Sequence, residues 1–385
     1  MTQLKGPLSG IRVIDLTRVL AGPYCTMMLA EQGAEIVKIE TPKGGDDSRH
    51  IGPFIDGRSG YFMSINRGKK SVALDLKAPA DRRHFETLLE TADVLVENYR
   101  GGTLEKLGYG WDMLHARYPG LIYCAISGFG HTGPYAKKPA YDMIVQAMGG
   151  IMSITGYAGQ PPARVGASIG DLAAGMYGAA AVQGALFHRA RTGEAQKLDI
   201  AMLDCQVALL ENAIAQTHVR GTPPGPIGAR HPAIAPFGMF RARDGYLAVA
   251  AGNDTLFRAL CTTIGEPGLA ADPRYATNPL RVDNVAALTE ALDAALGRDD
   301  RAAWFAKLEA AGIPCGPIND VADIMSDPQV AARNMIVHID DPAGPFPTPG
   351  NPIKSSLFPD VRTRAAAPAL DQHRAEILGG GPAAD

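Results

Sequence analysis

One aspartate in this chain stands where a carboxylate could do chemistry. Asp171 lies in Gly170-Asp-Leu-Ala-Ala-Gly175, directly before a run of small and apolar residues that predicts a buried helix over 172–190. The commoner role of such an aspartate is the helix N-cap, whose carboxylate accepts hydrogen bonds from first-turn amides. The same amides and the helix dipole favour the charged form, and an ionised, partly enclosed carboxylate can act as a nucleophile. The local pattern is compatible with both roles.

A glycine-rich segment is the second candidate. Gly128-Phe-Gly130-His-Thr-Gly133 matches the G-x-G-x-x-G pattern of dinucleotide-binding proteins. A dinucleotide site requires a helix to begin at this motif. Here Pro134 to Pro139 predicts a loop, and no helix is expected before about Tyr141. The segment therefore predicts an active-site loop, whose amides could stabilise an oxyanion.

Histidine and cysteine give weaker signals. His131 and His231 lie in loops rich in glycine and proline, where a histidine is usually solvated. The cysteines lack the spacing of a metal site, so we expect no bound metal. Three of them lie in apolar runs and are expected to be reduced, which is typical of a cytoplasmic protein. The five cysteines are Cys25, Cys124, Cys205, Cys261 and Cys315.

The elements that must position these residues alternate in kind along the first part of the chain. Short apolar runs alternate with amphipathic segments that have Gly or Pro at their boundaries. Such alternation predicts an α/β fold, a Rossmann-like open parallel sheet with right-handed crossovers. The expected strands are 11–16, 34–40, 71–76, 94–97, 121–127 and 198–201, and the expected helices are 24–32, 79–91, 104–117 and 203–216.

The character of the sequence changes near residue 222. Residues 221–236 are rich in Pro and Gly and predict a loop, after which one strand and three helices predict a smaller α+β domain. Those elements are the strand 246–251 and the helices 254–264, 284–296 and 302–311. We expect a large domain over 1–200, a linker over 201–222, a small domain over 223–328 and a return to the large domain over 329–385.

Composition excludes several kinds of partner. The formal net charge is only −3, and no run of eighteen apolar residues occurs. Neither nucleic acid nor a membrane is therefore expected as a partner. The first residues lack the charged and apolar regions of a signal peptide, which also favours a cytoplasmic location.

Six short segments, in the same order, resemble those of the family III CoA-transferases (CaiB/BaiF type), the group that also contains the α-methylacyl-CoA racemases. They are Leu16-Thr-Arg-Val-Leu-Ala-Gly-Pro23, Asn66-Arg-Gly-Lys-Lys-Ser71, Val96-Glu-Asn-Tyr99, Gly128-Phe-Gly-His-Thr-Gly-Pro134, Gly170-Asp171 and Gly312-Ile-Pro-Cys-Gly-Pro-Ile318. The resemblance implies a Rossmann-like large domain with an inserted smaller domain. It also implies a homodimer in which two ring-shaped subunits interlock.

The resemblance implies roles for individual residues. Asp171 is then the nucleophile that carries CoA as an aspartyl thioester, and CoA is a substrate rather than a permanently bound cofactor. The residues expected to contact CoA are Val19, Leu20, Ala21, Leu74, Lys77, Asn98, Tyr99, Arg100, Lys106, Tyr141 and Asp142. The residues expected in the substrate loops are Gly128, Gly130, Arg230 and His231. Thr41 departs from the pattern, because some oxalate-specific members have a basic residue there.

Two further comparisons bear on the activity. The racemases have a histidine at the position of Tyr141, and tyrosine, with a pKa of about 10, is a poor base at neutral pH. The loop 225–232 lacks the four-glycine run of the formyl-CoA:oxalate members, whereas segments 16–23, 251–254 and 316–319 are similar to members that use succinyl-CoA with glutarate-like acids. We expect CoA transfer from succinyl-CoA to a small dicarboxylate. A racemase or epimerase, a formyl- or acetyl-CoA:oxalate transferase, and a silent CoA-binding protein stay open as alternatives.

Overall fold

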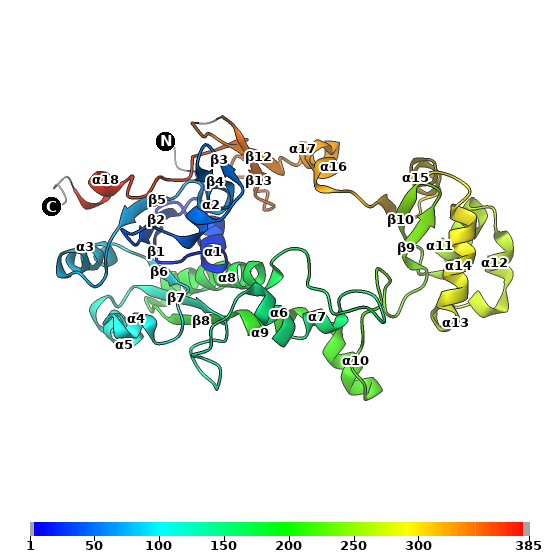
Figure 1. Ribbon diagram of the computed structural model, residues 1–385, viewed down its shortest axis with the longest axis horizontal. Helices are drawn as coiled ribbons and strands as arrows, with labels where there is room; N and C mark the ends of the chain where they lie inside the picture. The colour runs from blue at the N-terminus through cyan, green and yellow to red at the C-terminus, as the bar shows by residue number, and fades with distance from the viewer. Residues whose placement is uncertain (1–3, 343, 380–385) are drawn as a thin grey trace. The chain divides into compact units, whose positions relative to one another are not determined.

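The computed structural model describes residues 4–342 and 344–379, and the chain forms two compact units (Figure 1). Unit 1 contains the residues up to Ser153, then 164–224, and those from Pro328 onward. Unit 2 contains 154–163 and 225–327. The sequence division assigned 154–163 to the large domain, but these ten residues pack within unit 2. The assignment of functions to the separate domains stays a prediction.

A six-stranded sheet with all neighbouring strands parallel forms the centre of unit 1. Its order is β5-β2-β1-β6-β7-β8, so the predicted open parallel α/β sheet is confirmed. After β1, the chain adds β2 and β5 on one side of β1, and then β6, β7 and β8 on the other. The loops after β1 and β6 therefore flank the switch point at which doubly wound sheets bind ligands. The strands are β1 (Arg12–Asp15), β2 (Glu35–Glu40), β5 (Lys70–Ala73), β6 (Val94–Glu97), β7 (Ile122–Ser127) and β8 (Lys197–Ala201).

Helices cover both faces of this sheet (Figure 1). Val13 and Ile122 belong to the apolar cluster on the face that α1 and α8 cover, and their neighbours Ile14 and Tyr123 belong to the cluster under α3 and α5. Because side chains alternate along a strand and both faces are buried, these strands appear in the sequence as unbroken apolar runs. The four helices are α1 (Ala21–Ala30), α3 (Pro79–Glu90), α5 (Trp111–Arg117) and α8 (Ile169–Thr192).

Glycines bring α1 and α8 very close together. A Cβ atom on Gly175 would lie 2.8 Å from the carbonyl oxygen of Ala21, and one on Gly178 would lie 2.8 Å from the Cδ1 atom of Ile126. Only glycine allows this approach. The beginning of α1 therefore packs against the first turns of α8.

The edge strand β5 is covered by a segment from far along the chain. The outward backbone groups of Ser71 and Ala73 bond to the segment 371–374 that leads into α18 (Arg374–Leu378). The Ser71 amide donates to Nδ1 of His373 at 3.2 Å, and the Ala73 amide donates to Oδ1 of Asp371 at 2.7 Å. These bonds satisfy backbone groups that an edge strand otherwise leaves open.

Two helices predicted as continuous are interrupted. The expected helix 104–117 divides at Gly108, whose φ is 89°, and the expected helix 203–216 divides at Glu211, whose φ is 49°. The segment 329–385, expected to return to the large domain, contains a three-stranded sheet. The remaining elements of unit 1 are η1 (Asp47–His50), β3 (Phe54–Ile55), β4 (Arg58–Ser59), α2 (Gly60–Asn66), α4 (Thr103–Lys106), α6 (Asp142–Met148), α7 (Ile151–Ile154), α9 (Met202–Leu209), α10 (Asn212–Arg220), α17 (Pro328–Ala332), β12 (Ile336–Ile339), β13 (Phe346–Pro349) and β14 (Thr363–Arg364).

Unit 2 combines a three-stranded antiparallel sheet with helices around its own apolar core. The strand β9 was not predicted; it pairs with β10 through a tight hairpin whose turn residues are Arg243 and Asp244. The elements of unit 2 are β9 (Phe237–Ala242), β10 (Gly245–Ala250), α11 (Asp254–Thr263), α12 (Pro267–Ala271), η2 (Pro273–Tyr275), α13 (Asn278–Asp283), α14 (Val285–Leu296), α15 (Arg301–Ala310), β11 (Cys315–Pro317) and α16 (Val321–Ser326). In the described parts of the chain, no helix has the length and apolar character needed to cross a membrane.

Candidate active site

Asp171 lies in the first turn of α8 but does not cap it. The helix begins at Ile169 and its N-cap is Ser168, so Asp171 is the third helical residue and the predicted N-cap role is wrong. Its side chain is half-buried. Among the described residues, no group donates a hydrogen bond to its carboxylate. Neither carboxylate oxygen is therefore occupied by a hydrogen bond from these residues.

A second, buried carboxylate holds the beginning of α8 in place. Asp142, the first residue of α6, is 8% exposed. Its Oδ1 atom accepts a hydrogen bond from the Gly170 amide at 2.8 Å, and its Oδ2 atom accepts one from Nε2 of Gln146 at 2.8 Å. The Asp142 carboxylate thus contacts α8 at Gly170, the residue directly before Asp171.

This neighbourhood changes the protonation of Asp171. Burial, and then the charge of Asp142, raise the pKa of Asp171 to about 7. First-turn amides and the helix dipole were expected to favour the charged form, but burial and a like charge outweigh them. Burial, and then the charge of Asp171, also raise the pKa of Tyr61 on α2 to about 12. The Tyr61 hydroxyl is therefore protonated near the Asp171 carboxylate. No motif in the sequence indicated that Tyr61 lies near Asp171.

The loop after β1 reaches the same place. Leu20 is the N-cap of α1 and Ala21 is its first residue, and Ala21 contacts α8 at Gly175. Gly175 lies four residues after Asp171 and therefore on the same side of the helix. The structure thus brings Ala21, Asp142 and Asp171 together, as the sequence had predicted for one site.

The loop after β6 is tied to the loop after β1. Oδ1 of Asn98 accepts a hydrogen bond from the Arg18 amide at 2.9 Å, and Nδ2 of Asn98 donates to the Arg18 carbonyl at 2.7 Å. The Tyr99 amide donates to Glu97 at 2.6 Å. Two segments predicted to contact CoA therefore meet at the switch point of the sheet.

A cleft of about 490 Å³ lies between the loops after β6 and β7. Arg100 and Lys106 are exposed and adjacent in sequence to two of its lining residues, and no ion pair involves either of them among the described residues. The loop from 128 contains no helix before Asp142, so the predicted loop after the glycine motif is confirmed. Tyr141, the N-cap of α6, is 72% exposed. The cleft is lined by Gly101, Gly102, Glu105, His131, Thr132, Ala136, Lys137, Lys197 and Asp199.

His131 is not the solvated loop histidine that was predicted. Its side chain is only 8% exposed and lies between two charged groups. Nδ1 lies 3.2 Å from Nζ of Lys197, and Nε2 lies 3.6 Å from Oε1 of Glu97. Burial raises the pKa of Glu97 to about 7. The glycine-rich loop is thus anchored on the sheet by its histidine.

The remaining predicted residues lie elsewhere. Leu74 is buried and Lys77 is exposed in the connection after β5, at the edge of the sheet. Arg230 and His231 belong to unit 2, whereas Asp171 belongs to unit 1. Gly128 packs tightly, since a Cβ atom there would lie 2.2 Å from the Cβ atom of Ala140.

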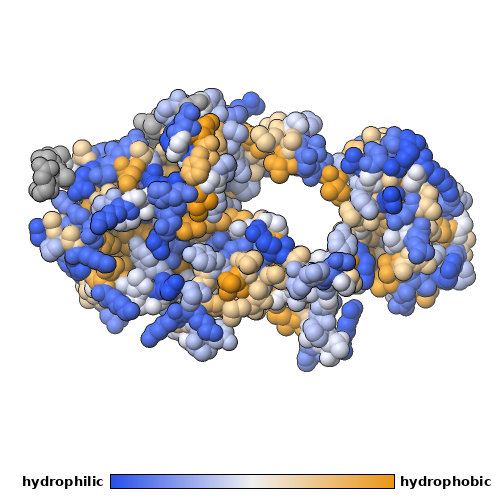
Figure 2. All heavy atoms as spheres, in the orientation of Figure 1, coloured by the Kyte–Doolittle hydropathy of each residue, from blue (hydrophilic) through white to orange (hydrophobic). Residues whose placement is uncertain are grey.

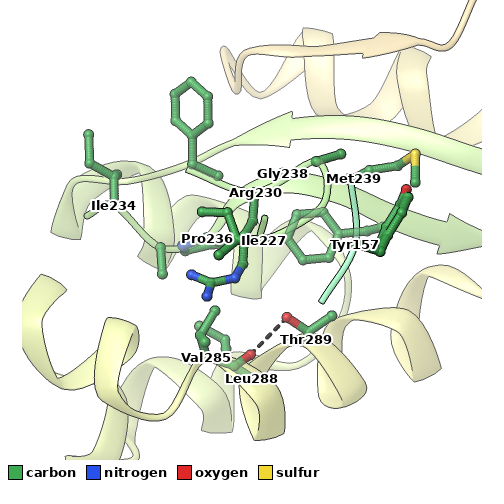
Figure 3. Close-up of a pocket in the computed structure, with 14 residues that line it drawn as sticks. Tyr157, Ile227, Arg230, Ile234, Pro236, Gly238, Met239, Val285, Leu288 and Thr289 are labelled. Carbon is green, nitrogen blue, oxygen red and sulfur yellow. Dashed lines mark hydrogen bonds between the residues drawn. The ribbon is translucent and has the colours of Figure 1, made fainter. Parts of the chain in front are cut away.

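Arg230 lines a pocket of about 170 Å³ in unit 2 (Figure 3). Its guanidinium extends toward the beginning of α14, and the surrounding walls are mainly apolar, with Ile227, Ile234 and Val285 among them. Arg230 is exposed, and none of the described residues forms an ion pair with it. An apolar pocket with one unpaired cation is suited to an acyl chain that ends in a carboxylate.

Two other kinds of site are not formed. Gly166-Ala-Ser-Ile-Gly170 matches the G-x-S-x-G pattern of serine hydrolases, but a nucleophile elbow requires a strand before the serine, and residues 161–168 contain none. Within residues 4–342 and 344–379, no group of three or more His, Cys, Asp or Glu side chains is placed to hold a metal ion.

Comparison with known proteins gives consistent matches over nearly the whole chain. The sequence profile of CoA-transferase family III matches residues 8–374. An acetyl-CoA:oxalate CoA-transferase from Acetobacter aceti is 45% identical over 374 residues, which cover 97% of this chain and 95% of that protein. A succinate–glutarate CoA-transferase from Agrobacterium fabrum is 41% identical over 386 residues, covering 98% and 96%. The crystal structure of a CAIB/BAIF family protein from Brucella suis superposes with a TM-score of 0.86 at 41% identity, covering 97% of this chain and all of that one.

Proposed function

This chain belongs to CoA-transferase family III, and we propose that it moves CoA from succinyl-CoA to a small dicarboxylate through a thioester on Asp171. The observation that carries this proposal is the state of the Asp171 carboxylate. It is half-buried, it accepts no hydrogen bond from the described residues, and its pKa is about 7. Such a group is substantially ionised at neutral pH and more nucleophilic than an ordinary aspartate.

The proposed reaction is a double displacement. An Asp171 oxygen attacks the thioester carbonyl, which gives a mixed anhydride and releases the CoA thiolate. The thiolate attacks the aspartyl carbonyl, releases the first acid as a carboxylate and leaves an aspartyl–CoA thioester. The acceptor carboxylate attacks that thioester and expels the thiolate again, and the thiolate then attacks the acceptor's acyl carbonyl. Asp171 is regenerated, and the reaction as written needs neither a metal nor a resident cofactor.

We assign CoA recognition to the loops at the carboxyl ends of the strands. Val19 to Ala21 and Asn98 to Arg100 meet at the switch point, and Leu74 and Lys77 follow the edge strand. Arg100 and Lys106 flank the cleft, and their unpaired cations suit the phosphates of CoA. Tyr141 is exposed next to Asp142 and suits a contact with the ligand, while the amides of Gly128 and Gly130 are proposed donors to the oxyanion.

Arg230 and His231 are proposed to recognise the distal carboxylate of the acid. A dicarboxylate uses one carboxylate to form the thioester, so the other needs a cationic partner. Arg230 is exposed, unpaired among the described residues, and lies beside an apolar pocket. This arrangement supports succinate and glutarate-like acids, whose methylene groups an apolar wall would contact.

Oxalate is the second candidate acceptor. The Acetobacter aceti relative at 45% identity is named for acetyl-CoA and oxalate. That similarity favours the oxalate alternative, against which the missing glycine run in 225–232 had counted. A transferase that uses acetyl-CoA and oxalate would employ the same Asp171 chemistry with a shorter acid.

A homodimer is proposed as the working assembly. Large apolar side chains are exposed along α6, α8, α9 and α10, and Figure 2 shows apolar side chains gathered over the region of α6, α7 and α9. Exposed apolar surface of this extent marks an interaction site. The exposed residues are Met143, Ile144, Met148, Met176, Tyr177, Phe187, Val207, Ile214 and Val219.

All five cysteines are free, which suits the proposed cytoplasmic location.

A panel of acceptors tests the proposed function. Purified protein is given succinyl-CoA or acetyl-CoA with glutarate, mesaconate, citramalate, malate, itaconate or oxalate, and new acyl-CoA esters are separated by chromatography. We expect succinyl-CoA with one of the longer dicarboxylates to give the highest kcat/KM. Preference for acetyl-CoA and oxalate would establish the second candidate. Exchange of the α-proton without any acceptor would instead indicate a racemase.

The pH profile tests the assigned state of Asp171. Because its pKa is raised, the nucleophile becomes protonated as the pH falls through about 7, so kcat/KM for the acyl-CoA should decline on that acidic side. Asp142→Asn removes one cause of the shift but not the burial, so the decline should move to lower pH. Asparagine keeps an oxygen that can accept the Gly170 hydrogen bond, which preserves the helix start. An unchanged acidic limb in this variant would contradict the role of Asp142.

A further inference from the structure

The loop after β1 has its backbone fixed by side chains from three other parts of the sheet. Asn98 holds both polar backbone groups of Arg18. Nζ of Lys38 donates to the Thr17 carbonyl at 2.6 Å, and Oδ1 of Asp46 accepts from the Val19 amide at 3.0 Å. Successive residues of the loop are therefore held by the loop after β6, by β2 and by the loop after β2.

Val19 adopts a conformation that its side chain disfavours. Its φ is 67°, in the left-handed region, where a β-branched residue is a clear outlier. Such a conformation persists only when its surroundings impose it. The amide of Val19 donates its hydrogen bond to Asp46, so this contact acts directly on the residue with the disfavoured φ.

Asp46 is built to impose this conformation. It is 3% exposed, and its Oδ2 atom lies 2.9 Å from Nζ of Lys38, which is fully buried. Its Oδ1 atom also accepts hydrogen bonds from the amide and hydroxyl of Ser48, and its own amide donates to Glu40. Although burial opposes the charge, Lys38 and the Val19 amide lower the pKa of Asp46 to about 2. The carboxylate is thus rigid and charged at working pH.

We propose that Asp46, with Lys38, is the positioning residue of the CoA loop, holding Val19 in its left-handed conformation so that Leu20 and Ala21 are presented to CoA beside Asp171. The proposal rests on the proposed function, because it assumes that this loop binds CoA. Asp46 itself is buried and does not touch the ligand. Its effect is transmitted through the Val19 backbone, which sets the direction in which the chain enters α1.

Glycine at position 19 separates this role from a general loss of stability. Glycine adopts positive φ as readily as negative φ, so it needs no restraint from Asp46. Glycine also increases the freedom of the unfolded chain, so it does not restore stability that another substitution removes. Recovery of CoA binding by Val19→Gly in an Asp46 variant is therefore expected only if Asp46 acts on this conformation.

Calorimetric titration with CoA tests the proposal on folded protein, with circular dichroism as the check of folding. Asp46→Ala should raise the Kd at least tenfold, and the double variant should recover at least threefold relative to Asp46→Ala. Val19→Gly alone is measured as the reference for the double variant. Asp47→Ala is the matched control, because Asp47 is exposed and forms its ion pair only with the Arg18 side chain at 3.2 Å. It should bind within threefold of wild type.

Three results would overturn the proposal. They are wild-type affinity in Asp46→Ala, no recovery in the double variant, and an equal loss in Asp47→Ala. If Asp46→Ala does not fold, Asp46→Asn replaces it in both the single and the double variant. Asparagine removes the charge and replaces one of the two oxygens that face the Val19 amide and Lys38 with an NH2 group. The Kd should then rise at least threefold and recover with Val19→Gly. Wild-type protein that fails to bind CoA would overturn the proposed function as well, whereas the failures named above would leave it standing.

Discussion

Asp171→Ala is expected to abolish CoA transfer, with kcat lower by on the order of 10⁵-fold, as is typical when a covalent nucleophile is removed. The methyl group cannot form either the anhydride or the thioester, and no other acid of α8 stands in the first turn to replace it. The measurement is the conversion of succinyl-CoA and the best acceptor, followed by chromatography of CoA esters. Binding of CoA should persist, because the loops after β1 and β6 are unchanged.

Asp204→Ala is the matched control for this substitution. Asp204 is the third residue of α9, as Asp171 is of α8, and it is exposed. Both substitutions remove a carboxylate from the third position of a helix, but Asp204 lies on the surface and outside the proposed site. Asp204→Ala should keep kcat within about twofold of wild type, a range typical of surface substitutions.

The covalent intermediate can be captured directly. Wild-type protein is mixed with acyl-CoA without acceptor and treated with hydroxylamine, which converts an aspartyl thioester to a hydroxamate, and the peptide that contains Asp171 is examined by mass spectrometry. We expect the modification on that residue. Modification elsewhere, or wild-type turnover in Asp171→Ala, would contradict the double-displacement mechanism.

Lys69→Met is expected to lower the free energy of unfolding by about 3–5 kcal/mol, the range for removal of one partner from a buried ion pair. Lys69 and Asp15 are both fully buried, and their charged atoms lie 3.0 Å apart. Nζ of Lys69 also donates to the Pro23 carbonyl, to Oγ1 of Thr26 and to Oδ1 of Asn66. Methionine fills the volume but leaves the Asp15 charge without its cation.

The adjacent lysine provides the control. Lys70 pairs with Glu35 at 2.7 Å, but its side chain is 31% exposed, and exposed pairs contribute less than about 1 kcal/mol. Urea unfolding followed by circular dichroism compares Lys69→Met with Lys70→Met, and Asp15→Asn/Lys69→Met should recover part of the loss. Equal losses in the two single variants would show that burial of the pair is not what makes Lys69 important.

Much of the sheet could be predicted because its strands are buried on both faces. The expected strand 94–97 has the same bounds as β6, and the expected strand 34–40 differs from β2 by one residue. The interruptions at Gly108 and Glu211 could not be predicted, because single residues with positive φ break helices whose apolar patterns continue across them. The strand β9 was missed because it lies directly after a segment rich in proline.

The candidate site was predicted only in part. Sequence motifs singled out Ala21, Asp142 and Asp171, which the fold brings together. They gave no indication of Tyr61 or Asp46, which follow β2 in connections without recognisable motifs and reach the site only through tertiary contacts. The N-cap role was wrong for a local reason: the helix begins at Ile169, three residues earlier than the apolar run indicates. With this earlier start, Asp171 lies half-buried near Asp142, and its pKa rises instead of falling.

The cover over β5 has a consequence for synthesis on the ribosome. Ser71 and Ala73 are made some three hundred residues before His373 and Asp371, which bond to their backbone groups. During that interval the nascent sheet has an unsaturated edge, and unpaired edges invite strand addition from neighbouring chains. A nascent chain in which residues 371–374 are not yet made therefore presents β5 as an open edge, and their synthesis closes that edge.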